Sequence, residues 1–174
     1  DAGLTMTTDE RVDLVSFTGS CVVGAKVAAQ AAPTLKRLVL ELGGKSANIF
    51  LPDSVDKAAG GAYQVCTSHA GQGCVLGTRV FVPEADKPKV LEQMAAMMQG
   101  IKIGVASDPA TQLGPVISAG QRDRCEHFTQ AAVDAGGRVV TGGKRPAEFN
   151  KGFFFEPTVL DLPDNKNPAA QEEI

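Results

Sequence analysis

Short apolar runs alternate with longer helix-forming segments along most of this chain, and this alternation limits the folds open to it. The first run, Leu14–Phe17, passes through a Gly-Ser turn into an alanine-rich helical segment that ends near Pro33. Strands are predicted at residues 38–41, 47–51, 79–82, 138–141 and 153–159, and helices at residues 54–68, 86–99 and 118–135. Strands and helices that alternate in this way build βαβ units, so we predict an α/β fold with a largely parallel sheet.

The composition is that of an ordinary globular protein and excludes several functions. Hydrophobic residues make up 43% and charged residues 21% of 174 residues, and the net charge of −3 disfavours a nucleic-acid-binding role. No apolar run approaches the ~20 residues of a membrane span, and no signal peptide is visible. Four cysteines in a chain this apolar do not require a disulfide framework, so we expect a reducing, cytoplasmic setting.

Cys74 is the side chain with the strongest claim to chemistry. It lies in the sequence AGQGCVLGTR over residues 70–79, among three glycines. A cysteine is most often a buried structural residue, but a buried one does not need such surroundings. A nucleophilic thiolate does, because a substrate carbon must reach the sulfur. Cys21, Cys66 and Cys125 fall on predicted helices without nearby glycine clusters, and we expect them to be structural.

A possible base precedes this cysteine. Glu41 ends an apolar run and is followed by Gly43 and Gly44, so its carboxylate is expected to point into a cleft. Taken alone, Glu41 would more often be a solvated carboxylate at a strand end. Together with Cys74 it becomes a candidate general base, and we predict that both groups open onto one cleft.

Four segments resemble motifs of the aldehyde dehydrogenase superfamily, in the same order. They are VSFTGS at residues 15–20 with Gly24 after it, ELGGKS at 41–46, GQGC at 71–74 and QEEI at 171–174. The step from Glu41 to Cys74 is 74 − 41 = 33 residues, which is similar to the family's spacing.

This resemblance implies an oxidoreductase that uses NAD or NADP to convert a small aldehyde into a carboxylic acid. Cys74 would form a thiohemiacetal and then a thioester, which water activated by Glu41 would hydrolyse. The cofactor's diphosphate would lie near Gly19, Ser20 and Gly24, at a helix N-terminus that favours negative charge. The resemblance also places Leu42 at the cofactor and Glu173 at the ribose next to the nicotinamide.

The resemblance further implies two domains and an oligomer. Residues 1–43 would be the last part of a dinucleotide-binding domain, and residues 44–174 most of a catalytic domain. Relatives form homo-oligomers, either dimers or tetramers. The glutamate at position 41 favours the hydrolytic members over the coenzyme-A-acylating ones, which lack it.

Three other functions stay open from the sequence. The chain could be a truncated, non-catalytic or structural fragment, or Cys74 and Glu41 could hydrolyse activated esters without a cofactor. A metal site is the third: Cys66, His69 and Cys74 could be written as a ligand set, and Cys125 with His127 as a pair. No convincing fourth ligand accompanies either set, so we expect no metal and none is assigned.

Overall fold

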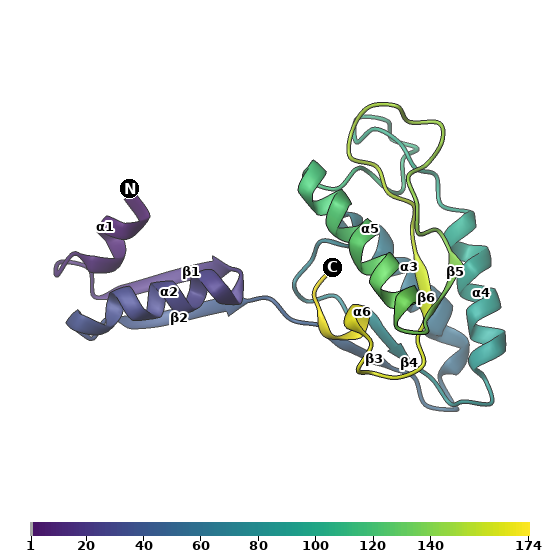
Figure 1. Cartoon of the computed structure of the whole chain (residues 1–174), viewed down its shortest axis with the longest axis horizontal. Helices are drawn as coiled ribbons and strands as arrows, with labels where there is room; N and C mark the ends of the chain where they lie inside the picture. The colour runs from purple at the N-terminus through teal and green to yellow at the C-terminus, as the bar shows by residue number, and fades with distance from the viewer. Residues whose placement is uncertain (1) are drawn as a thin grey trace. The chain divides into compact units, whose positions relative to one another are not determined.

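The chain folds into two compact units in a computed structural model that describes residues 2–174 (Figure 1). One unit ends at Gly44, and the other is Lys45–Ile174. The division falls one residue after the predicted boundary behind Gly43. Asp1, with which the predicted cofactor-domain segment begins, lies outside the described residues. That the two units belong to a cofactor domain and a catalytic domain stays a prediction.

The first unit is a βαβ motif. It contains α1 (Ala2–Thr8), β1 (Leu14–Gly19), α2 (Cys21–Ala31), a short 3₁₀ turn η1 (Ala32–Thr34) and β2 (Arg37–Leu42). The two strands are parallel, and α2 covers one face of the pair (Figure 1). Alternate strand residues are exposed on the other face, including Leu14 and Val39 at 48% and 45% exposure. The predicted strand–turn–helix at residues 14–32 is therefore present.

The second unit holds three helices longer than one turn and two pairs of short strands. Its elements are β3 (Ala47–Ile49), η2 (Val55–Lys57), α3 (Ala58–Thr67), η3 (Ser68–Gly71), β4 (Arg79–Phe81), α4 (Lys87–Gln99), α5 (Ala119–Asp134), β5 (Arg138–Thr141), β6 (Val159–Asp161) and α6 (Pro168–Gln171). β3 pairs with β4 in parallel, whereas β5 and β6 are antiparallel. The fold is α/β, with two of its three strand pairs parallel.

The core of the second unit lies where α3 packs against α4. Alanines on α3 face longer side chains on α4, and this small-to-large match lets the two helices approach closely. The buried cluster consists of Ala58, Ala59, Ala62, Val90, Met94, Met98, Ile101, Leu113 and Val159. No helix among residues 2–174 is both long enough and apolar enough to cross a bilayer.

The predicted strand at 153–159 is wrong, because only Val159 of that range is paired in a ladder. The polar groups of the preceding residues bond elsewhere: the Phe153 carbonyl accepts from Val116 N–H (3.0 Å), and Glu156 N–H donates to the Lys144 carbonyl (2.9 Å). Pro157 has no N–H to offer a ladder. The strand instead begins six residues later, at Val159, as β6 opposite β5.

Candidate active site

Cys74 lies in an exposed turn between η3 and β4. Leu76 N–H donates to the Gly73 carbonyl (3.2 Å) and Thr78 N–H donates to the Leu76 carbonyl (2.9 Å). The next residue, Val75, is 83% exposed. The sulfur is therefore not enclosed in packed hydrocarbon, and a reagent can approach it within this unit.

Two of the glycines near Cys74 are required by the path of the backbone. Gly71 has φ +74°, a left-handed conformation that suits glycine. Gly77 instead lies close to β3, where an added Cβ would come within 3.0 Å of Asn48 Cβ and 3.2 Å of the Ala47 carbonyl oxygen. One glycine thus permits the turn, and the other lets the turn rejoin the sheet.

The turn is preceded by an unusual run of left-handed backbone. His69 (φ 51°) and Ala70 (φ 54°) are left-handed as well as Gly71, although neither is a glycine. The Gln72 side chain lies against this run: Nε2 donates to the His69 carbonyl (3.0 Å), and Oε1 accepts from Ile117 N–H (2.9 Å). No role was predicted for Gln72 from the sequence, where its place directly before Gly73-Cys74 was the one available signal.

Glu41 and Leu42 end β2 in the first unit. The Glu41 side chain is exposed and the Leu42 side chain is half-buried. Glu41 and Cys74 belong to different compact units, so their shared cleft stays a prediction.

The N-terminus of α2 has the form expected of a diphosphate site. Ser20 caps the helix, with Oγ accepting from Val23 N–H (3.3 Å). The N–H groups of Cys21 and Val22 have no acceptor within an α-helix, and they point along the positive end of its dipole. These groups fit an anionic diphosphate, as the predicted roles of Gly19 and Ser20 require.

Packing between α2 and β2 explains why position 24 is a glycine. An added Cβ would come within 2.6 Å of the Leu42 side chain, so the missing side chain lets α2 lie close to β2. This close approach is the role that one glycine of a dinucleotide-binding turn commonly has. The predicted cofactor residues Gly24 and Leu42 are thus in contact with each other.

Glu173 is exposed, but its main chain is held. The Arg124 guanidinium on α5 donates to the Glu173 carbonyl from Nε (2.9 Å) and Nη2 (2.6 Å), and Nη2 lies 3.5 Å from the Glu172 carboxylate. Burial lowers the pKa of Lys45, while the nearby Glu173 carboxylate raises it in part. Neither Arg124 nor Lys45 was identified from the sequence, which gives no sign that α5 reaches residue 173.

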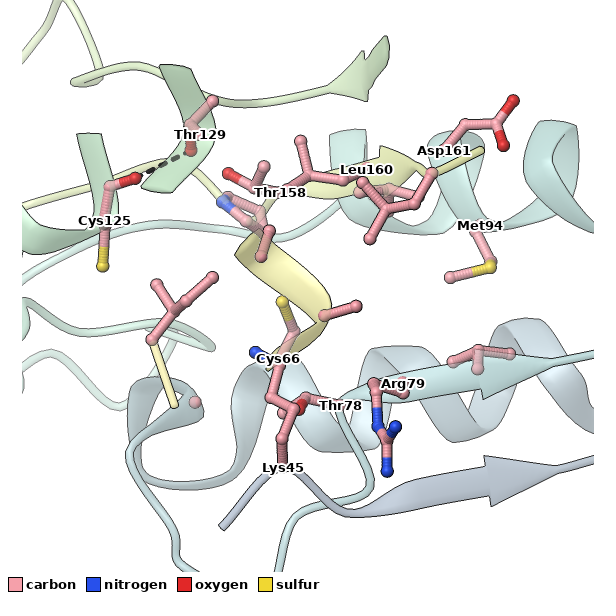
Figure 2. A pocket seen from close by; sticks show the side chains of 18 of the residues that line it. Lys45, Cys66, Thr78, Arg79, Met94, Cys125, Thr129, Thr158, Leu160 and Asp161 are labelled. Atoms are coloured by element: carbon pink, nitrogen blue, oxygen red, sulfur yellow. Dashed lines mark hydrogen bonds between the residues drawn. The ribbon is translucent and has the colours of Figure 1, made fainter. Parts of the chain in front are cut away.

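A cavity of about 470 Å³ lies in the second unit, and Cys74 is not among the residues that line it (Figure 2). The sulfur atoms of Cys66 and Cys125 point into it, and burial raises the pKa of both thiols. Residues 78–82 and 155–162 line it without a break, so main-chain edges of β4 and β6 border it. Neither edge has a strand partner among residues 2–174. Cys66 and Cys125 lie on α3 and α5, as predicted.

No metal centre is visible in the described part of the chain. Within residues 2–174, no three His, Cys, Asp or Glu side chains gather so that they could hold an ion. Cys66 faces the cavity, whereas Cys74 and His69 are exposed.

Comparison with known proteins agrees with the motifs. The sequence model of the aldehyde dehydrogenase family matches residues 1–174. The chain belongs to the aldehyde dehydrogenase family. It is 39% identical to the Bacillus subtilis protein DhaS, which carries the aldehyde dehydrogenase name, over 100% of this chain and 35% of that protein. It is 36% identical to the betaine aldehyde dehydrogenase of the same organism, over 94% of this chain and 34% of the relative.

Solved aldehyde dehydrogenase structures share the fold. Betaine aldehyde dehydrogenase from Staphylococcus aureus, in complex with NAD⁺, has 37% identity and a TM-score of 0.93, covering 98% of this chain and 35% of that one. A variant of aldehyde dehydrogenase C from Pseudomonas syringae, in complex with NAD⁺ and octanal, has 34% identity and a TM-score of 0.94, over 99% of this chain and 36% of that one. The chain thus spans about a third of the length of the aldehyde dehydrogenases it matches.

Proposed function

We propose that the chain carries the reacting thiol of an NAD(P)-dependent aldehyde dehydrogenase, with Cys74 as the nucleophile. The observation that supports this most is the contrast between its cysteines. Cys74 is exposed in the family's GQ-x-C motif, whereas Cys66 and Cys125 face the cavity with raised pKa values. Cys21 is exposed too, but it lies outside the motif, and its thiol donates to the Gly43 carbonyl (3.8 Å).

In the proposed reaction the Cys74 thiolate attacks the aldehyde carbon. A carbon–sulfur bond forms, and the carbonyl oxygen becomes an oxyanion that accepts a hydrogen bond from the Cys74 backbone N–H. A bound NAD(P) would supply the acceptor for the hydride that this carbon loses as the thioester forms. Glu41 takes a proton from the water that attacks the resulting thioester, and the thiolate leaves as the acid forms.

The first unit supplies part of the cofactor site in this proposal. Ser20 and Gly19 bring the N–H groups of α2 to the diphosphate, and Gly24 and Leu42 keep α2 close to β2. The Glu173 carboxylate accepts a hydrogen bond from a hydroxyl of the ribose next to the nicotinamide. The relatives from S. aureus and P. syringae hold NAD⁺, and the latter also holds octanal, which supports a dinucleotide and an aldehyde here. A cytoplasmic dimer or tetramer is proposed on the resemblance alone.

The test separates the thiol's chemistry from complete turnover, because the chain spans only a third of its relatives. An activated ester such as p-nitrophenyl acetate transfers its acyl group to a reactive thiol without a cofactor. Mass spectrometry of the chain should find the acyl group on Cys74. In Cys74→Ala it should be lost, whereas Cys21→Ala should leave it unchanged.

Glu41 and the cofactor are tested next. In Glu41→Gln the acylated Cys74 should persist longer than in the parent, because deacylation lacks its base. Addition of an aldehyde and NAD or NADP should give reduced cofactor only with Cys74 present. Ester hydrolysis at Cys74 without any cofactor reduction would favour the esterase alternative. Acylation spread over the cysteines regardless of position 74 would refute the proposal.

A further inference from the structure

The Cys74 turn is held weakly by its own hydrogen bonds. Within the described chain, the main-chain bonds of residues 73–78 are those of Leu76 and Thr78, and both remain inside the turn. At its C-terminal end the turn joins β4, where Arg79 N–H donates to the Ser46 carbonyl (3.1 Å). The N-terminal end needs another attachment if the sulfur is to keep one position.

The backbone at that end is not one that ordinary residues adopt by themselves. Left-handed conformations at His69 and Ala70 are unfavourable for residues with a Cβ, and they persist where surrounding contacts enforce them. Two bonds from Gln72 converge on the same acceptor. Its backbone N–H (3.2 Å) and its side-chain Nε2 (3.0 Å) both donate to the His69 carbonyl.

The other end of the same side chain reaches a distant segment. Gln72 Oε1 accepts from Ile117 N–H at 2.9 Å, across 45 positions of sequence. Ile117 directly precedes Ser118, which caps α5 by accepting from Gln121 N–H (3.1 Å). The amide therefore joins the left-handed run to the fixed start of a helix.

We propose that Gln72 is a positioning residue for Cys74. Its side-chain amide fastens the N-terminal end of the reactive turn to the segment that enters α5. The role needs one donor and one acceptor at this reach, which an amide provides and an ionised carboxylate does not. The importance of the turn rests on the proposed function of Cys74, but the attachment itself can be measured without any catalysis.

Hydrogen exchange at Leu76 is the readout, because that amide does not touch Gln72. In Gln72→Ala the Leu76 amide should exchange roughly tenfold faster or more, since the turn loses two side-chain hydrogen bonds. Gln112→Ala is the matched control: Gln112 Oε1 accepts from Lys102 N–H (2.7 Å) and Nε2 donates to Tyr63 Oη (3.0 Å). That variant should leave Leu76 protection unchanged.

Gln72→Glu tests the same attachment within one protein. A protonated carboxyl can donate to the His69 carbonyl and accept from Ile117 N–H, whereas a carboxylate can only accept. The protonated form thus favours the closed turn, so Leu76 protection should be high below about pH 4 and should fall as the carboxyl ionises. Protection is measured relative to the intrinsic exchange rate at each pH, with the parent chain as reference.

Two results would overturn the inference. One is unchanged Leu76 protection in Gln72→Ala together with no difference between Gln72→Glu and the parent in the pH dependence. The other is equal loosening by Gln112→Ala, which would mean that general destabilisation opens the turn. If the turn loosens as expected but the ester never acylates Cys74, the attachment stands and the proposed function fails.

Discussion

Asn167 offers the sharpest test of how the C-terminal segment is held in the fold. Its side chain is 3% exposed and makes two hydrogen bonds: Nδ2 donates to the Ala132 carbonyl on α5 (3.0 Å), and Oδ1 accepts from Ala169 N–H to cap α6 (3.1 Å). A typical hydrogen bond contributes about 1 kcal/mol net, and a buried group left unpaired costs about 1–3 kcal/mol. In Asn167→Ala the Ala132 carbonyl keeps its bond from Gly137 N–H (2.8 Å), but Ala169 N–H is left buried without its acceptor. We therefore expect the free energy of unfolding to fall by about 2–3 kcal/mol.

Urea denaturation followed by circular dichroism measures this change. With an m-value of roughly 2 kcal/mol/M, the midpoint should move down by about 1–1.5 M. Asn165→Ala is the control, because the Asn165 side chain is exposed and makes one hydrogen bond, in which Oδ1 accepts from Arg79 Nη1 (2.8 Å). We expect a change below about 0.5 kcal/mol. Equal midpoints for Asn167→Ala and Asn165→Ala would refute the reasoning.

Three further predictions concern thiols, acid stability and helix packing. With iodoacetamide near pH 8, Cys66 and Cys125 should react much more slowly than the two exposed cysteines, and this difference should vanish in denaturant. Burial opposes the charge of Asp161, but hydrogen bonds from two cations outweigh it and hold the pKa of Asp161 below its usual value. The stability that this carboxylate contributes should therefore be present above about pH 4 and be lost as the pH falls through the lowered pKa. When the free energy of unfolding is measured by urea titration at several pH values, Asp161→Asn should lose less stability than the parent over this acid range. Gly24→Ala should destabilise the βαβ unit by forcing a Cβ against the Leu42 side chain, and Leu42→Ala should relieve part of the loss; strictly additive effects in a double-mutant cycle would contradict this contact.

Elements set by local sequence were predicted well. The strand Arg138–Thr141 has the bounds expected of it. Ser118 was expected to begin the long helix and is its cap, because a serine before a helix satisfies an otherwise free N–H. Ser54 was likewise expected to begin a helix, but its hydroxyl accepts from Leu51 N–H (3.1 Å), and a 3₁₀ turn precedes α3 instead. In both cases the serine hydroxyl bonds to a residue three positions away. Ser118 accepts from the N–H of a later residue, and Ser54 from the N–H of an earlier one.

The site was predictable only as far as its motifs reach. The Cys74 motif indicates a reactive thiol, but nothing in the sequence tells that Gln72 meets Ile117 or that Arg124 holds the Glu173 carbonyl. Such contacts arise when segments tens of residues apart are brought together, and neither propensity nor periodicity encodes them.

The left-handed run before Cys74 also restricts which residue types can replace those at positions 69–71. A β-branched residue at His69 or Ala70 would crowd its own backbone, so valine, isoleucine and threonine should be disfavoured there. Asparagine, aspartate and glycine should be the readily accepted replacements. Which substitutions are tolerated next to the thiol should then depend on the positive φ angles of three residues as much as on the reactivity of the sulfur.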